Sequence, residues 1–229
     1  MLSFPGAATT PGVFGSTVVF DGASTSITRP GPLAVGDRMF MFVGGDSTSS
    51  PLTTPSGWTL VDTVGQPSSI ASTVALYTKV VADAEPGGYV LNNPGGRYIA
   101  VIGVYPGFSG TARDTDGATQ YSSSPGSTFP LGAISQVVGD LILAVGFVRN
   151  KTVSGIPVGN ASTPFVPPSP LANKVAYAFD GSDAIPEGGF WVGVGTAAST
   201  GTYTPGTVSF TNNIATPTSS SLLASFPPA

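Results

Sequence analysis

The triplet Val-Gly-Asp occurs twice in this chain, at residues 35–37 and at residues 138–140. Each copy is followed by an apolar run of strand length, which covers residues 39–43 in the first case and 141–148 in the second. Self-similarity at a fixed offset marks one structural unit that is used twice. The repeated unit combines a turn with an apolar strand, so the sequence predicts a duplicated β-structure.

A second pair of similar segments supports the duplication. Residues 83–90 and 184–191 are both turns rich in Pro and Gly that end in aromatic residues, and their offset nearly equals that of the triplets. We expect two pseudo-repeats, at about 16–110 and 111–229, that together build one β-sandwich over residues 16–229. Two separate small sandwiches are the alternative.

Short runs of β-branched and aromatic residues recur along the chain between Gly and Pro residues, whereas no stretch of ten residues has a convincing helical period. Residues 72–81 alternate, which is typical of a half-buried antiparallel strand, and residues 98–105 form the nearly continuous apolar run of a buried strand. The polar segment 110–126 is interpreted as a turn-rich junction. The expected fold class is all-β: an antiparallel, jelly-roll-like sandwich with little or no helix.

Composition excludes several functions. The chain has no Cys and no His, which removes thiolate chemistry, Ser-His-Asp triads and the commonest ligands of zinc and iron. Charged residues make up only 9% of the chain, and the eight Lys and Arg are scattered singly, so nucleic-acid binding is not expected. Apolar runs are too short to span a membrane, and residues 1–10 lack the pattern of a secretory signal. We expect a protein that is not an enzyme and that has no cofactor and no metal.

Carboxylates are the remaining chemical groups of interest. Asp114 and Asp116 resemble the start of a calcium-binding loop, but no distal Glu follows, so an Asx-type turn is favoured and cation binding stays open. Asp37 and Asp140, the repeated pair, suggest either a twinned binding site or a device that starts a strand by hydrogen bonding within its own turn. The structural interpretation is favoured.

Four aromatic residues are candidates for binding. Trp58 and Trp191 have flat rings that suit stacking on sugars, although packing in the core is the favoured interpretation. Residues 1–15, rich in Pro, Gly, Ala and Thr, are expected to form an extended N-terminal arm. Phe4 and Phe14 are isolated apolar residues of this arm and are the candidate attachment residues.

The order of motifs over residues 35–106 resembles a group of bacteriophage virion proteins found as minor tail, fibre-associated or head-surface proteins. After the Gly-Asp turn come Pro-Ser-Gly-Trp-Thr at 55–59, Leu-Tyr-Thr-Lys at 76–79 and Glu-Pro-Gly-Gly-Tyr at 85–89. The resemblance is weaker in the second half, where Thr163, Pro164 and Phe165 stand in for the tryptophan motif. No catalytic residue is implied by it.

The resemblance implies a β-sandwich on the surface of a tailed-phage virion, assembled in the host cytoplasm. Such a protein would be a capsid decoration or a head or tail fibre component that attaches to other virion proteins and self-associates around a symmetry axis. The alternative is a carbohydrate-binding module that recognises host surface glycans. A β-sandwich hydrolase or lyase is the third and weakest hypothesis. Burial of Trp58 and Trp191 would exclude the glycan hypothesis in this form.

Overall fold

Every pair of neighbouring strands is antiparallel in the part of the chain that the structure describes. This structure is a computed structural model. It describes residues 12–15, 18–21, 24–46, 53–66, 71–92, 97–121, 126–149, 165–179, 188–214 and 218–229. No helix occurs in these ranges, and none therefore has the length and apolar character that crossing a membrane requires. The all-β prediction is confirmed.

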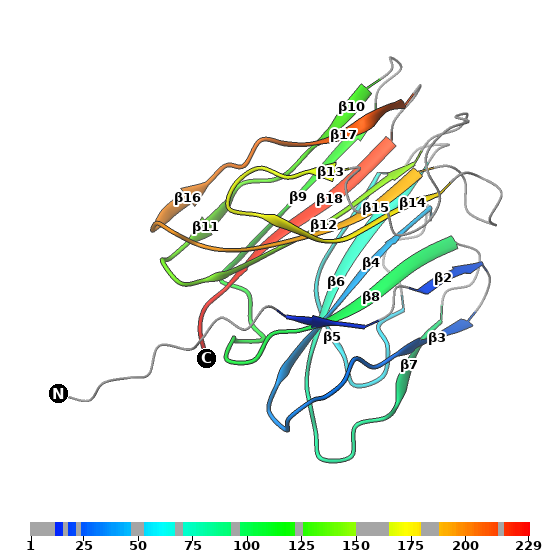
Figure 1. The fold of residues 1–229 in the computed structure, drawn as a ribbon, viewed down its shortest axis with the longest axis vertical. Helices are drawn as coiled ribbons and strands as arrows, with labels where there is room; N and C mark the ends of the chain where they lie inside the picture. Colours follow the sequence, from blue (N-terminus) through cyan, green and yellow to red (C-terminus); the bar gives the residue numbers. More distant parts are fainter. Residues whose placement is uncertain are drawn as a thin grey trace.

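The first half of the chain forms a large sheet and a small one (Figure 1). The large sheet has the order β1-β8-β4-β6-β5, and β2 also pairs with β8. Its strands are β1 (Val13–Phe14), β2 (Val18–Asp21), β4 (Arg38–Gly45), β5 (Thr59–Gln66), β6 (Ser72–Val80) and β8 (Arg97–Val104). The small sheet pairs β3 (Ser24–Thr28) with β7 (Gly88–Asn92). The first strands of this half, β1 and β2, thus pair with its last strand, β8, and β3 pairs with the strand before it, β7. This is the wrapping of a jelly roll.

The second half repeats this wrapping. Its large sheet has the order β14-β15-β12-β18-β9, and two small sheets, β10-β17-β13 and β11-β16, cover the outer face. The large sheet contains β9 (Asp114–Tyr121), β12 (Leu141–Arg149), β14 (Ala172–Phe179), β15 (Gly188–Thr196) and β18 (Thr218–Phe226). The small sheets contain β10 (Gly126–Pro130), β11 (Ile134–Gln136), β13 (Phe165–Val166), β16 (Gly201–Tyr203) and β17 (Thr207–Ile214). Again the first strand, β9, pairs with the last, and β10 pairs with the last but one, β17.

The two large sheets pack face to face, so the molecule has four β-layers: one small sheet covers the outer side of the first half and two small sheets cover that of the second (Figure 1). One apolar cluster lies between the large sheets and takes side chains from both halves. Phe40 of β4 meets Phe226 of β18 there, with ring centroids 4.7 Å apart. The halves are therefore two jelly rolls that share a central core, a combination of the two arrangements considered from the sequence.

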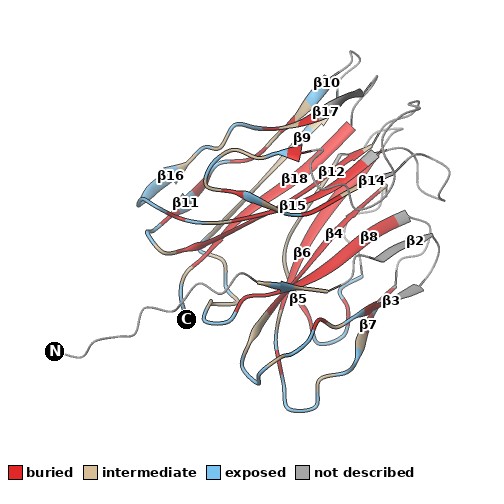
Figure 2. Ribbon diagram, in the orientation of Figure 1, coloured by how far each residue is buried: buried red, intermediate tan, exposed pale blue. Residues whose placement is uncertain are grey.

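Each half also has a core of its own between its large and small sheets. Alternate residues of one strand serve the two cores: Phe40 and Phe42 face the shared cluster, whereas Met39 and Met41 face the cluster of the first half. This explains why the central strands are buried along both faces (Figure 2). The prediction that residues 72–81 form a half-buried strand is wrong on this point, because β6 has a β-layer on each side.

The two ends of the molecule differ. β4 and β12 both begin at one end, which we call the turn end; it carries the two Val-Gly-Asp turns, the segment 105–113 that joins the halves, and the C-terminal residues 227–229. The side chains of Arg149 and Asp46, 3.8 Å apart, link the halves at the opposite end. A hydrogen bond of 2.8 Å between Ser72 and Ser220 adds to this link.

Two further expectations need correction. The polar junction predicted at 110–126 contains β9, an eight-residue strand, because its backbone completes the edge of β18 despite its polar side chains. The segments 83–90 and 184–191 are not equivalent, since the first leads into β7 of a small sheet and the second into β15 of a large sheet. By position in the fold, the counterpart of β7 is β17.

The counterpart of the tryptophan motif is also displaced. Trp58 donates its backbone N–H to the carbonyl of Pro55 at 3.1 Å, and Leu171 donates to Pro168 in the same way at 3.0 Å. Both side chains are buried directly before the next strand of their large sheets. The second copy of the tryptophan motif is therefore at 168–171 and has Leu in place of Trp. The position expected from the sequence was 163–165, of which 163–164 lie outside the described residues.

Candidate functional site

The two aspartates of the repeat occupy the same position in the two halves. Asp37 accepts a hydrogen bond from the backbone N–H of Ala34, and Asp140 accepts one from Val137, both at 2.8 Å from Oδ2. The glycine before each aspartate has a φ of +90°, a conformation that L side chains rarely adopt. Each aspartate thus closes the turn that starts a central strand, as expected from the structural interpretation of the repeat.

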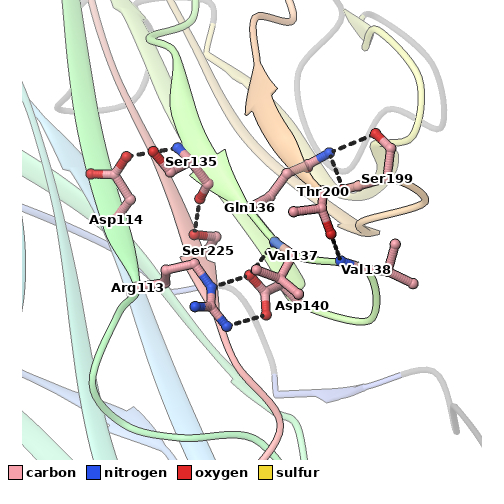
Figure 3. A network of polar contacts seen from close by, with 10 residues as sticks. All are labelled: Arg113, Asp114, Ser135, Gln136, Val137, Val138, Asp140, Ser199, Thr200 and Ser225. Atoms are coloured by element: carbon pink, nitrogen blue, oxygen red, sulfur yellow. Dashed lines mark hydrogen bonds and ion pairs between the residues drawn. The ribbon is translucent and has the colours of Figure 1, made fainter.

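The second aspartate has an additional partner. Asp140 is fully buried and forms a two-pronged ion pair with Arg113, with distances of 2.6 Å to Nε and 3.1 Å to Nη2 (Figure 3). This hydrogen bonding raises the pKa of the Arg113 guanidinium. Arg113 ends the segment that joins the halves, and its backbone N–H donates to Ser225 of the last strand at 2.7 Å. The pair therefore fixes the joining segment to the turn.

Asp114 and Asp116 bind backbone amides. Asp114 accepts from the N–H of Ser135 at 2.7 Å, as Figure 3 shows, and Asp116 accepts from the N–H of Ala133 at 2.7 Å. The first bond ties β9 to β11, and the second ties β9 to the connection between β10 and β11. Among the described residues no group of three acidic, His or Cys side chains is placed to hold a metal ion.

Both tryptophans are buried, with 6% of Trp58 and none of Trp191 exposed. Trp191 donates Nε1–H to Asn173 at 2.6 Å and lies against the backbone of Gly193. Trp58 meets Tyr89 edge to face, with ring centroids 5.0 Å apart. Neither indole can present a face to a sugar ring, so these two residues are wrong as glycan-stacking candidates.

Phe14 packs against its own half. Its ring centroid lies 6.1 Å from that of Phe42 and 5.9 Å from that of Tyr105, and β1 pairs with β8. Phe14 is partly buried against the core of its own chain, so it does not belong to a free attachment arm. Phe4, the other candidate, lies outside the described residues.

The three motifs that carry the virion resemblance meet in one place, beside β7. A groove of about 420 Å³ lies there; we call it the Lys79 groove. It is lined by Thr53, Thr54, Pro55, Ser56, Gly57, Lys79, Pro86, Gly88, Tyr89 and Val90. Its walls are mainly hydroxyl groups, prolines and backbone, and Lys79 supplies the charge among its lining residues.

A buried carboxylate holds Lys79 in this groove. Glu85, whose side chain is 2% exposed, lies 3.0 Å from Lys79 Nζ and accepts hydrogen bonds from the Tyr89 hydroxyl at 2.5 Å and the Ala82 N–H at 2.8 Å. Burial alone would raise the pKa of Glu85, but these hydrogen bonds and the ammonium lower it below its usual value. Burial and the Glu85 carboxylate raise the pKa of Tyr89.

Gly57 leaves space for the Lys79 ammonium because it has no side chain. A Cβ added at Gly57, where φ is +77°, would lie 2.9 Å from Lys79 Nζ, and the ammonium is 5.7 Å from the centre of the Tyr89 ring. The described part of the second half has no such arrangement at this position, since the residue on β15 that corresponds to Lys79 is Gly195. Lys79, Glu85 and Tyr89 belong to motifs that are visible in the sequence, but their contact is not. The contact depends on how β6 and β7 meet across the turn between them.

Comparison of the chain with models of protein families, with curated proteins and with solved structures gives no match. The site is therefore assigned on geometry alone. The Lys79 groove and the turn end are the two features of the described surface on which the proposals below rest.

Proposed function

We propose that this protein is a non-enzymatic structural component on the surface of a tailed-phage virion, as a capsid decoration or a head or tail fibre component. It attaches to other virion proteins through its turn end. The order of the sequence motifs supports the virion setting. The attachment rests on one observation, the distribution of exposed apolar side chains.

Five of the eight exposed large apolar residues of the described chain are at the turn end. Val35 and Val138, at 64% and 60% exposure, occupy equivalent positions in the two Val-Gly-Asp turns. Val137 is next to the second turn, and Val80 and Val13 are in register with the first residues of β4. Exposed apolar residues gathered on one face are typical of a protein contact.

The use of charged groups is consistent with this role. The ion pairs Arg113–Asp140 and Lys79–Glu85 hold turns, and Arg149–Asp46 links the halves. Asp114 and Asp116 bind backbone amides. These groups act within the fold, and the large exposed apolar side chains at the turn end are left for docking. Self-association around a symmetry axis remains part of the proposal, since virion parts of this kind act as multiple copies.

The proposal is tested by quantitative mass spectrometry of purified phage particles, followed by imaging with a labelled antibody. We expect the protein at a fixed copy number per particle. The double variant Val35→Glu/Val138→Glu should remain folded and be lost from particles, because a carboxylate in an apolar contact is costly to desolvate. The matched control is Tyr121→Glu, which changes a residue of similar exposure, 55%, near the opposite end. Absence of the wild-type protein from particles would overturn the proposal.

A further inference from the structure

The small sheets of the two jelly rolls differ at one edge. In the second half, β17 lies between β10 and β13, so both of its edges are paired. In the first half, its counterpart β7 pairs with β3 only, among the strands that the structure describes. The Lys79 groove lies along the other side of β7, since Gly88, Tyr89 and Val90 are in its lining. The groove therefore lies beside the edge of β7 that corresponds to the β13-paired edge of β17, and its wall includes Thr53, which precedes the 55–58 turn as β13 precedes the 168–171 turn.

The register of β3 and β7 shows which backbone groups face the groove. Arg29 donates its N–H to the carbonyl of Gly87 at 3.0 Å, so the hydrogen-bonded pairs with β3 involve residues 87, 89 and 91 of β7. In an antiparallel pair the residues between these direct their N–H and C=O groups to the opposite edge. Gly88 and Val90 thus present donors and acceptors to the groove, and the Val90 side chain is 49% exposed beside them.

We infer that this edge of β7, which no described strand pairs with, is a docking edge for an extended peptide segment of another protein, which lies in the Lys79 groove and adds a third strand to the small sheet. β13 provides the pattern for this occupant, because it pairs antiparallel with β17 at the corresponding edge. Addition of a strand to an exposed edge is a common mode of peptide recognition, in which main-chain hydrogen bonds supply the affinity.

The lining defines the chemistry of the segment. Opposite β7 the wall consists of Thr53, Thr54, Pro55, Ser56 and Gly57, which suits small or neutral polar side chains. Lys79 has one bond to Glu85 and keeps donors for a carbonyl or carboxylate of the segment. A Lys or Arg at that position would be repelled. The volume of about 420 Å³ lies within the range of ligand pockets. This inference does not depend on the virion proposal.

Amide hydrogen exchange of the full chain, followed by NMR, tests the inference. The probe is a set of synthetic nine-residue peptides selected from a random display library on the immobilised protein. In the free protein, the amides of Gly88 and Val90 should exchange at least about tenfold faster than those of Tyr89 and Leu91, which bond to β3. Bound peptide should slow Gly88 and Val90 by a similar factor and leave the other two unchanged.

Variants separate docking from folding. Val90→Pro removes the N–H that faces the groove and should weaken peptide binding at least tenfold, whereas Val90→Thr keeps the N–H and should bind like the wild type. If Val90→Pro fails to fold, Thr54→Trp fills the groove from the opposite wall and leaves β7 intact. Protection of Gly88 and Val90 already in the free protein would overturn the inference, since the chain itself would then occupy the edge. Selected peptides that bind without protecting these amides, or no selected peptide at all, would overturn it as well.

Discussion

Phe40 and Phe226 belong to different halves of the chain and meet edge to face in the shared core, with ring centroids 4.7 Å apart. Both side chains are fully buried. Phe40 is near the start of the central strand of the first jelly roll, and Phe226 ends the last strand of the second. Their contact makes the stability of each half depend on the other.

Replacement of either phenylalanine should therefore destabilise the whole molecule. We expect Phe40→Ala and Phe226→Ala each to lower the free energy of unfolding by about 3–5 kcal/mol. The double variant should lose less than the sum, by about 1 kcal/mol, because the two rings contact each other. Urea unfolding followed by tryptophan fluorescence and by circular dichroism should show one transition. Two separate transitions, with additive losses, would contradict a shared core.

Gly44 tests how tightly the two large sheets approach. A Cβ at Gly44 of β4 would lie 2.7 Å from the Phe190 ring and 3.0 Å from the Phe147 ring, both in the second half. We expect Gly44→Val to cost about 1–3 kcal/mol through overpacking, or more if the rings cannot shift. Gly87→Ala is the matched control, since no atom lies within 4 Å of its added Cβ. Equal melting temperatures for both variants would show that the sheets are not in close contact at Gly44.

The repeated aspartates should differ in their contribution to stability. Asp37→Ala removes one exposed hydrogen bond that closes a turn, so we expect a loss of about 1 kcal/mol. Asp140→Ala also leaves Arg113 without its buried partner, and its loss should be roughly two to three times larger. Thermal unfolding of the two variants side by side provides the measurement. A similar loss for both would mean that the ion pair adds nothing to the turn.

Glu85 should make stability depend on pH. Its pKa is lower in the folded protein than in the unfolded chain, so its contribution is present above the unfolded pKa of about 4.3 and is lost as the pH falls through the folded value. We expect the difference in urea midpoint between the wild type and Glu85→Gln to be largest near neutral pH and to shrink on acidification below about pH 4.

A control for this experiment lies in the same groove. Thr54→Val changes an exposed residue that does not titrate, so it should keep the pH dependence of the wild type. If Glu85→Gln retained that dependence as well, the Lys79–Glu85 pair would have no measurable role in folding.

The predicted strands differ in how well local sequence defined them. β4, β8 and β12 are runs of apolar residues, and their position at the centre of the sheets follows from burial on both faces. β9 was missed because Asp114 and Asp116 favour turns; backbone pairing with β18 makes it a strand, and the two carboxylates bond to β11 and to the β10–β11 connection. The candidate site was missed for a similar reason, since Lys79 and Glu85 meet through the turn between two different sheets.

The amino-acid sequence alone determined the all-β class, the repeated turn and the turn-closing role of Asp37 and Asp140, because hydrogen bonds within a turn are local, whereas the Arg113–Asp140 pair is a tertiary contact. Tertiary structure decided that the two jelly rolls share a core, that β7 corresponds to β17, and that Trp58 and Trp191 are buried. These features depend on which faces of distant strands pack together. A tryptophan suits both a core and a binding surface, because its indole offers a large apolar area in either place. The sequence around it therefore does not show which of the two it occupies.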